Sequence, residues 1–283
     1  MDKFLFGQFQ GLLKREVLEH RNLFIWAPVI LGLLIFMIDF LVISSLDEDA
    51  KISFIENLAR FFAGGSPLEM APAFVFPTLP FLGILYICAI LYLTNTLYQD
   101  RRELSVLFWQ SMPVSNFQTV LSKLVAIMLI APIFYVAVIF ALYVIGILWL
   151  IISGLSYDID VAGLGYMFLT ATLSLPIVYL FTVTSALWLL PFIGWLLLFS
   201  AFANRTPLLW AIGALALILF LEGFIFRTQF ISNWIETRSD IDNFLIVDYG
   251  GVFDRLFSYD MLIGLVVGSI FICGSVYMRR FVD

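Results

Sequence analysis

The chain has 283 residues, 62% of them hydrophobic and 13% charged, and its mean hydropathy is +1.03. Soluble domains carry about 25% charged residues, so this composition excludes a soluble enzyme and predicts an integral membrane protein. The net charge is -6, and no nucleic-acid partner is expected. Apolar runs recur along the whole chain, so residues 1–283 read as a single membrane domain.

Residues 1–22 predict a cytoplasmic helix that lies along the membrane surface, because apolar residues recur in them at helical spacing. Such a helix is either a passive anchor or an element that transmits motion to the first span. The apolar run that follows has no small-residue cleavage site behind it, so it is expected to stay as an anchor and not to be removed as a signal peptide. The apolar positions are Phe6, Phe9, Leu13 and Val17, with Leu5 and Leu12 beside them, and Lys14, Arg15, Glu16 and Glu19 are expected on the remaining surface.

Six uncharged or nearly uncharged runs are each long enough to cross a hydrocarbon layer of about 30 Å as a helix. The fold class is therefore all-α, with six transmembrane helices. Basic residues outnumber acidic ones on the side that holds both termini, and acidic residues dominate the other side, so both termini are expected in the cytoplasm. The runs are 24–46, 75–97, 120–152, 164–203, 207–226 and 259–278.

The run 164–203 is about twice as long as one crossing requires. A hairpin there would add a seventh span and move the basic C-terminal residues outside, against the charge rule. The alternative is one long helix, bent near Pro176 or Pro191, and we favour this alternative.

The cytoplasmic segment 98–119, between the second and third spans, contains an apolar patch outside the spans at residues 106–109. Pro113 ends the helix that carries the patch, and Ser115 with Gln118 forms a capping box that starts the next one. These features predict a rigid elbow whose aromatic residues, Phe108 and Trp109, form a docking surface. In the alternative interpretation these two side chains rest among lipid headgroups.

Two carboxylates, Asp39 and Glu222, fall within apolar runs near the predicted outer third of the membrane. Either they reach the outer headgroups, or they line the outer end of a substrate path and favour a cationic or amphipathic cargo. Cys88 and Cys273 lie in apolar runs, and His20 is the only histidine, so neither a disulfide nor a metal site is predicted.

With these elements in place, the chain resembles the permease subunits of type-two ABC exporters of bacteria. The resemblance runs nearly end to end and is strongest in the region of the family's coupling helix. Leu104 departs from the family, which often has glycine at that position. The matching positions are the segment Lys14 to Arg21 with Trp26 and Pro28; Arg102, Glu103, Ser105, Phe108, Trp109, Pro113, Val114, Ser115 and Lys123; Trp188, Pro191, Gly194, Trp195, Ser200, Ala201, Arg205, Pro207 and Trp210; and Arg279 with Arg280.

The resemblance implies a pair of permease subunits, here a homodimer, in the bacterial inner membrane, contacting its lipids and a cytoplasmic ATP-binding partner. No cofactor is expected in this chain. No lysine sits in a glycine-rich phosphate loop, so ATP and Mg would bind the partner, and the chain is not expected to be an enzyme by itself. The loop 227–258 would form short outer helices over the path. The residues implied in coupling are Glu16, Arg102, Glu103, Ser105, Phe108, Trp109 and Pro113.

Three other functions stay open from the residues alone. An ion-driven secondary transporter would favour internal repeats and broken helices at mid-membrane, and no convincing repeat is present. An intramembrane enzyme would need a nucleophile with a base, or a metal pair, at membrane depth. A membrane scaffold or sensor that moves no cargo would share every cytoplasmic feature.

Overall fold

A computed structural model describes residues 2–103, 114–240 and 249–280. Its described residues are all-helical, and six of its helical stretches are long and apolar enough to cross a membrane, as predicted. The chain is therefore a multi-pass membrane protein. The six stretches are Asn22–Ser44, Pro67–Arg102, Asn116–Ser156, Ala162–Trp188, Pro207–Phe226 and Tyr259–Met278.

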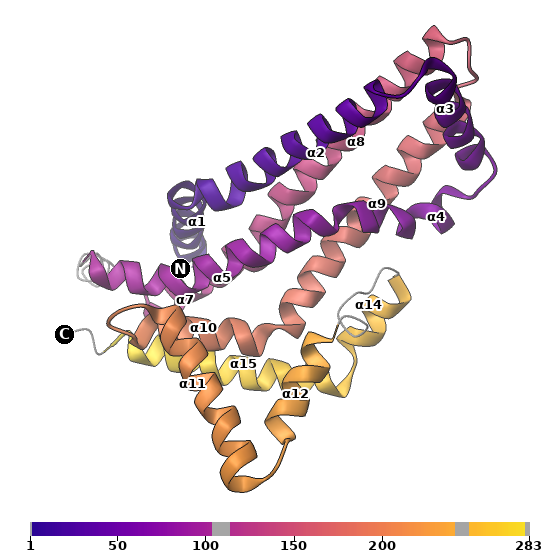
Figure 1. Cartoon of the computed structure of the whole chain (residues 1–283). Helices are drawn as coiled ribbons and strands as arrows, with labels where there is room; N and C mark the ends of the chain where they lie inside the picture. The colour runs from indigo at the N-terminus through magenta and orange to yellow at the C-terminus, as the bar shows by residue number, and fades with distance from the viewer. Residues whose placement is uncertain (1, 104–113, 241–248, 281–283) are drawn as a thin grey trace.

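The helices divide the molecule into two ends, which Figure 1 shows at the left and the right. The basal end, at the left, holds α1, the last turns of α5, α10 and α15, and the first turns of α7 and α11. The distal end holds α3, α4, α14 and the loop between α8 and α9. The α-helices are α1 (Asp2–Glu19), α2 (Ala27–Ser44), α3 (Glu48–Ala63), α4 (Pro67–Met70), α5 (Leu79–Arg102), α7 (Asn116–Val125), α8 (Ala131–Ser156), α9 (Ala162–Trp188), α10 (Leu190–Phe202), α11 (Pro207–Leu221), α12 (Phe230–Ser239), α14 (Tyr249–Leu256) and α15 (Tyr259–Met278).

Shorter turns of other helical types join several of these helices. Three are π-helical, η1 (Asn22–Trp26), η3 (Ala126–Ile130) and η4 (Glu222–Phe226), and one is a 3₁₀ helix, η2 (Ala71–Thr78). A π-helical turn leaves a backbone carbonyl without its usual partner. In η1 the Leu23 carbonyl accepts a hydrogen bond from the Tyr135 hydroxyl of α8, at 3.2 Å. The irregular turn is thereby tied to the third span.

The predicted single helix over 164–203 is in fact two helices, α9 and α10, separated at Leu189. Pro191 has no backbone N–H and its ring crowds the preceding turn, so the helix breaks there, while Pro176 lies inside α9 without a break. After the break, α10 packs along α15 and α5 and does not fold back on α9. The predicted bend near Pro191 is therefore confirmed, and no hairpin forms.

Helix α3 was not predicted. Asp47 precedes it in an extended conformation, Glu48 and Asp49 occupy its first turn, and Arg60 occupies its last, which suits the helix dipole. It packs against α9 at Gly163, where an added β-carbon would overlap the backbone carbonyl of Ala59. Only glycine permits this approach of two backbones.

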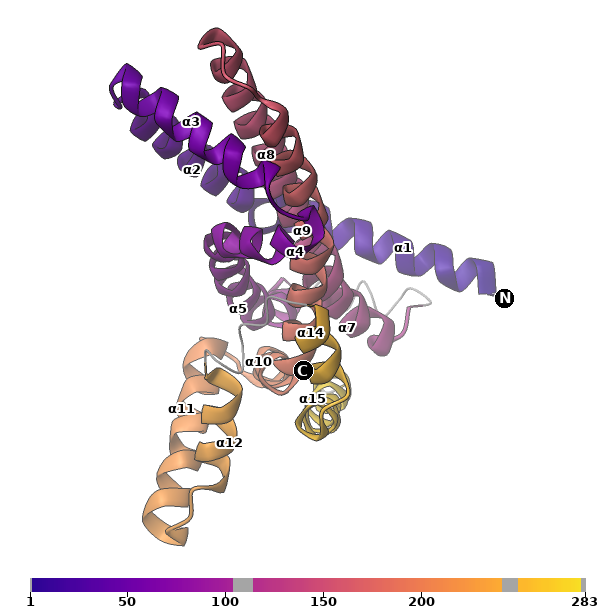
Figure 2. The ribbon, with the colours of Figure 1, turned by 90° about the vertical axis from the view of Figure 1, so that its right-hand side faces the viewer.

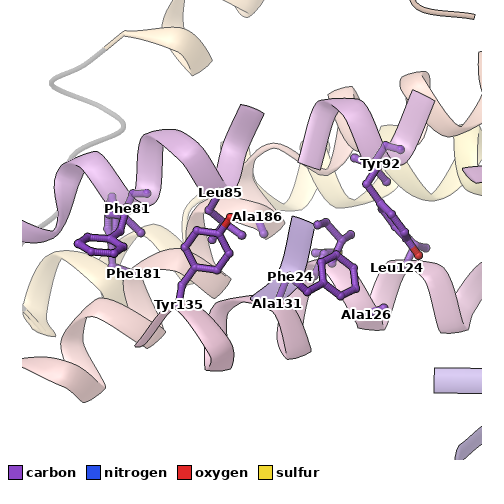
Figure 3. Packing of buried hydrophobic residues seen from close by; sticks show 14 of the residues in the cluster. Phe24, Phe81, Leu85, Tyr92, Leu124, Ala126, Ala131, Tyr135, Phe181 and Ala186 are labelled. Carbon is purple, nitrogen blue, oxygen red and sulfur yellow. The ribbon is translucent and has the colours of Figure 1, made fainter. Parts of the chain in front are cut away.

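The main core lies between α5, the α7–η3–α8 stretch and α9. Figure 3 shows its aromatic side chains between these helices, with Phe24 of η1 reaching in beside Tyr92. The two rings have centroids 5.3 Å apart, and both residues are at most 1% exposed. Contacts between aromatic rings stabilise a core beyond simple burial. The core thus fixes η1, and with it the end of α1, against α5.

Figure 2 shows two elements that project from this core, α1 on one side and the pair α11 and α12 on the other. Large apolar side chains along α11, including Leu209, Leu217 and Phe220, are more than half exposed. Much of α2 is similarly exposed. In a membrane protein such faces contact lipid or another subunit.

Candidate functional site

Four charged side chains from four helical elements meet at the basal end and form what we call the basal ion cluster: Glu16, Asp100, Lys123 and Arg279. Lys123 Nζ lies 2.8 Å from Glu16 Oε1 and 3.4 Å from Asp100 Oδ2. Arg279 Nη1 lies 3.6 Å from the same Asp100 oxygen. The cluster joins α1, α5, α7 and the residue that follows α15.

Two hydroxyl groups of α5 complete the hydrogen bonds of the cluster. The Tyr92 hydroxyl donates to Glu16 Oε2 at 2.8 Å, and the Lys123 ammonium donates to Thr96 Oγ1 at 2.8 Å. Glu16 and Lys123 are each only 1% exposed, so neither charge is solvated by bulk water. Within the cluster two positive and two negative side chains balance each other, which is the condition under which buried charges persist. At its edge Arg15, which pairs with Glu19 at 2.6 Å, lies 3.9 Å from Asp100.

The surroundings of Glu16 and His20 set the protonation of these two side chains. Burial by itself raises the pKa of the Glu16 carboxyl, but Lys123 and Tyr92 outweigh burial and hold that pKa below its usual range. Burial lowers the pKa of His20 and outweighs the opposing effect of Glu16. Near neutral pH Glu16 is therefore ionised and His20 is neutral.

Local sequence explains how Lys123 reaches the cluster. The predicted capping box starts α7: the Gln118 N–H donates to Ser115 Oγ at 3.1 Å, and the Ser115 N–H donates to Gln118 Oε1 at 3.0 Å. With the helix start fixed, Lys123 falls on the face of α7 that packs toward α1 and α5. Capping thus sets the rotation of the helix that carries the ammonium group.

The prediction that Glu16 lies on the outer surface of α1 is wrong. Leu13 and Val17, predicted to face the membrane, pack against the core, and Glu16 lies on that same packed face. The reason is the partner: a carboxylate is stable in a buried position when an ammonium group and a hydroxyl bind it. Helix α1 is consequently bonded to two spans and does not only rest on lipid.

A second polar contact at the basal end ties α5 to α10. The Arg101 guanidinium donates to the carbonyls of Ala203 at 2.6 Å and Ser200 at 3.2 Å, which belong to the unpaired carbonyls at the end of α10. In return, Ser200 Oγ accepts from the backbone N–H groups of Leu97 and Tyr98, both at 3.1 Å. The last turns of α5 and α10 are therefore locked together.

The other predicted coupling residues are only partly within the described chain. Arg102 and Glu103, at the end of α5, line a cavity of about 430 Å³ together with His20 and Tyr92. Glu16 does not line this cavity. Glu103 Oε1 accepts a hydrogen bond from Gln99 at 2.8 Å. The structure therefore brings Glu16, Arg102 and Glu103 to one end. The remaining four, Ser105, Phe108, Trp109 and Pro113, lie outside the described residues.

The two predicted substrate-path carboxylates lie in different surroundings. Asp39 is exposed on α2 and lines a cavity between α2, α3, α5 and α8. Glu222 is buried, and its oxygens accept the backbone N–H groups of Ile231 at 2.8 Å and Ser232 at 3.1 Å. Glu222 thus binds the first turn of α12, where a carboxylate complements the helix dipole. That either residue lines a substrate path stays a prediction.

The segment 227–258 contains two short helices in its described part, α12 and α14, and Arg238 of α12 holds it to the break between α9 and α10. Arg238 Nη1 donates to the Trp188 carbonyl at 2.5 Å, and its Nη2 donates to the Asp260 carbonyl. The guanidinium lies 4.5 Å from the ring centroids of both Trp188 and Trp234. Arg238 therefore supplies the donor that the carbonyl at the break needs.

Sequence reasoning did not assign Asp100, Lys123 or Arg279 to a common site, nor Tyr92 and Thr96 to their hydroxyl contacts. One signal was present: Lys123 is a lone charge at the beginning of a long apolar run, where a buried ammonium requires a partner. The identity of that partner cannot be read from a linear pattern.

Within the described residues, no group of three or more His, Cys, Asp or Glu side chains is placed to hold a metal ion. Comparison of the chain with protein-family models, with curated proteins and with solved structures found no match. The geometry of the basal end and the exposed spans are therefore the basis for a functional proposal.

Proposed function

We propose that the chain is the permease subunit of an ATP-driven ABC exporter in a bacterial inner membrane, paired with a second copy of itself. In this proposal both termini are cytoplasmic, and a separate ATP-binding subunit handles ATP and Mg. The observation that carries the proposal is the basal ion cluster, because it makes one mechanical unit of α1, α5, α7 and the end of α15, and it lies where α5 ends and α7 begins, the two helices between which residues 104–113 stand in the sequence.

A force applied to that segment has direct routes into the spans. The segment begins after α5 and ends before α7, and these two helices share Lys123 and its partners Thr96 and Asp100. Glu16 extends the same contacts to α1. Packed charged pairs of this kind move as rigid bodies, which is how domain closure in a partner would tilt the spans.

Docking is tested by co-purification with an ATP-binding subunit encoded beside this chain. Replacing both Phe108 and Trp109 by alanine should weaken co-elution and lower ATP turnover of the complex at least about tenfold, because aromatic anchors dominate binding energy at interfaces. The matched control is Phe253→Ala, an aromatic that is 54% exposed on α14 at the other end of the molecule. Undiminished co-elution of the double variant would remove the proposal.

Orientation is tested separately by cysteine labelling in intact cells. Cys88 and Cys273 are first replaced by alanine, since Cys273 is exposed and would react. Ser111→Cys should then resist a membrane-impermeant maleimide applied from outside, and Asp158→Cys, in the loop between α8 and α9, should react. The reverse pattern would place the docking segment on the wrong side for a cytoplasmic ATPase.

A further inference from the structure

The molecule holds a cavity of about 370 Å³ toward the distal end, and no residue of the basal ion cluster lines it. Aromatic side chains from five helical elements line it: Phe40 of α2, Phe54 of α3, Phe74 of η2, Phe81 of α5 and Trp149 of α8 are among them. The rings of Phe40 and Trp149 lie with centroids 5.7 Å apart at its edge. Its size and apolar lining match those of small-molecule binding sites, about 300–1,000 Å³.

Asp39 is the one charged residue among the described side chains that line this cavity. The two hydroxyl groups of the lining have partners within the protein: the Tyr143 hydroxyl donates to the Phe74 carbonyl at 2.9 Å, and the Thr78 hydroxyl donates to the Val75 carbonyl at 2.7 Å. No described residue forms an ion pair or a hydrogen bond with the Asp39 side chain. Its carboxylate is therefore available to a ligand.

The position of Asp39 makes an unpaired carboxylate costly. It lies five residues before the end of α2 at Ser44, or about 8 Å along the helix, inside a stretch that otherwise contains no charge. Ionisable groups at such depth are expensive unless a counter-charge neutralises them. Aromatic faces attract organic cations, and a neighbouring carboxylate adds a direct electrostatic contact.

We propose that this cavity binds an amphiphilic cation, with the hydrophobic body of the ligand among the aromatic rings and its cationic head against the Asp39 carboxylate. The inference rests on the proposed exporter function and deepens it by naming the class of cargo. The cation would be a small lipophilic compound or the ammonium headgroup of a lipid, and these sources share the same recognition chemistry. Glu222 takes no part, since its carboxylate binds the start of α12.

Equilibrium binding of radiolabelled tetraphenylphosphonium to the full chain in dodecyl maltoside, a detergent without ammonium groups, tests the site without any ATPase. Asp39→Asn should weaken binding about tenfold, which corresponds to about 1.4 kcal/mol. Asp39→Glu should stay within about threefold of the unsubstituted chain, because the charge remains. The matched control is Asp47→Asn, which removes a nearby exposed carboxylate that does not line the cavity and should change nothing.

A steric variant tests the cavity independently of the charge. Gly146 lines the cavity, and an added β-carbon there would meet nothing within 4 Å, so Gly146→Leu has room for its first side-chain carbon and places an apolar side chain at the cavity wall. It should abolish binding, while Gly213→Leu, at an equally open glycine of α11, should not. Unchanged affinity in both Asp39→Asn and Gly146→Leu would overturn the proposal, as would an equal loss in Asp47→Asn.

Adding phosphatidylethanolamine separates the two sources. If the lipid competes with the probe in the unsubstituted chain, the natural occupant is a headgroup, and if the affinity stays the same, it is a free lipophilic cation. If tetraphenylphosphonium does not bind, the exporter proposal is still tested by co-purification with the ATP-binding subunit. Failure of docking with intact binding leaves the cavity as a ligand site in a protein of another kind.

Discussion

Replacing Lys123 by methionine tests the basal ion cluster most directly. Methionine keeps the length and apolar stem of the side chain and removes the ammonium group, which contacts Glu16 and Thr96 at 2.8 Å and Asp100 at 3.4 Å. Asp100 would keep Arg279 and the more distant Arg15, but Glu16 would keep only the Tyr92 hydroxyl and His20 at 3.9 Å.

Breaking a buried ion pair by removing one partner costs about 3–5 kcal/mol, because the other charge stays buried and uncompensated. We therefore expect Lys123→Met to lower the free energy of unfolding by that amount, a change of roughly two to three and a half powers of ten in the folding equilibrium. Unfolding of the purified chain in mixed micelles, followed by tryptophan fluorescence during titration with a denaturing detergent, measures it.

Two further variants make the measurement specific. Lys14→Met removes an exposed ammonium from α1 and should change stability by less than about 0.5 kcal/mol. Glu16→Gln combined with Lys123→Met should recover a large part of the loss, because it removes the stranded carboxylate. If Lys123→Met unfolds at the same detergent fraction as the unsubstituted chain, the cluster is not buried as described.

Three further predictions concern the same fold. The pKa of Glu16 in the folded chain lies below its ordinary 4.5, so the stability that Glu16 contributes is complete above pH about 4.5 and is lost as the pH falls through the lower folded value. The free energy of unfolding, measured from pH about 3 to about 7, should fall on the acid side. In Glu16→Gln this fall should be smaller. Ser115→Ala should cost about 1 kcal/mol in the same detergent titration, and Ser115→Asp, another good N-cap, should not. Gly268→Val should lower the melting temperature because an added β-carbon lies 2.8 Å from the Leu190 backbone, whereas Gly213→Ala, with open space around it, should leave it equal or raise it.

The spans could be predicted from the sequence because the thickness of the hydrocarbon layer requires each spanning helix to have a minimum length and an apolar composition, and both can be read from the amino-acid sequence. The start of α7 could be predicted for a similar reason, since a capping box involves residues only three apart. A bend near Pro191 was also expected, but the division into two helices at Leu189 was not, and Arg238, which binds the Trp188 carbonyl at that point, lies 50 residues further along the chain.

The ion cluster could not be predicted in the same way. Glu16 and Lys123 are 107 residues apart, and helical spacing alone assigned Glu16 to the polar face of α1. Its burial depends on tertiary partners, which no local pattern records. Helix α3 was missed because charged residues at both of its ends resemble a solvated loop, while its contact with α9 depends on a glycine in another helix.

The bond between Glu16 and Lys123 also constrains the order in which a growing chain reaches its final shape. A ribosome adds about 5–20 residues per second, so roughly 5–20 s separate the synthesis of the carboxylate from that of its ammonium partner, 107 residues later. During this interval the Glu16 carboxylate of α1 has no ammonium partner, so the helix stays where water can solvate that charge. The contact between Glu16 and Lys123 can form only after the third span has been made, so α1 reaches its final packed position later than its place in the chain order suggests.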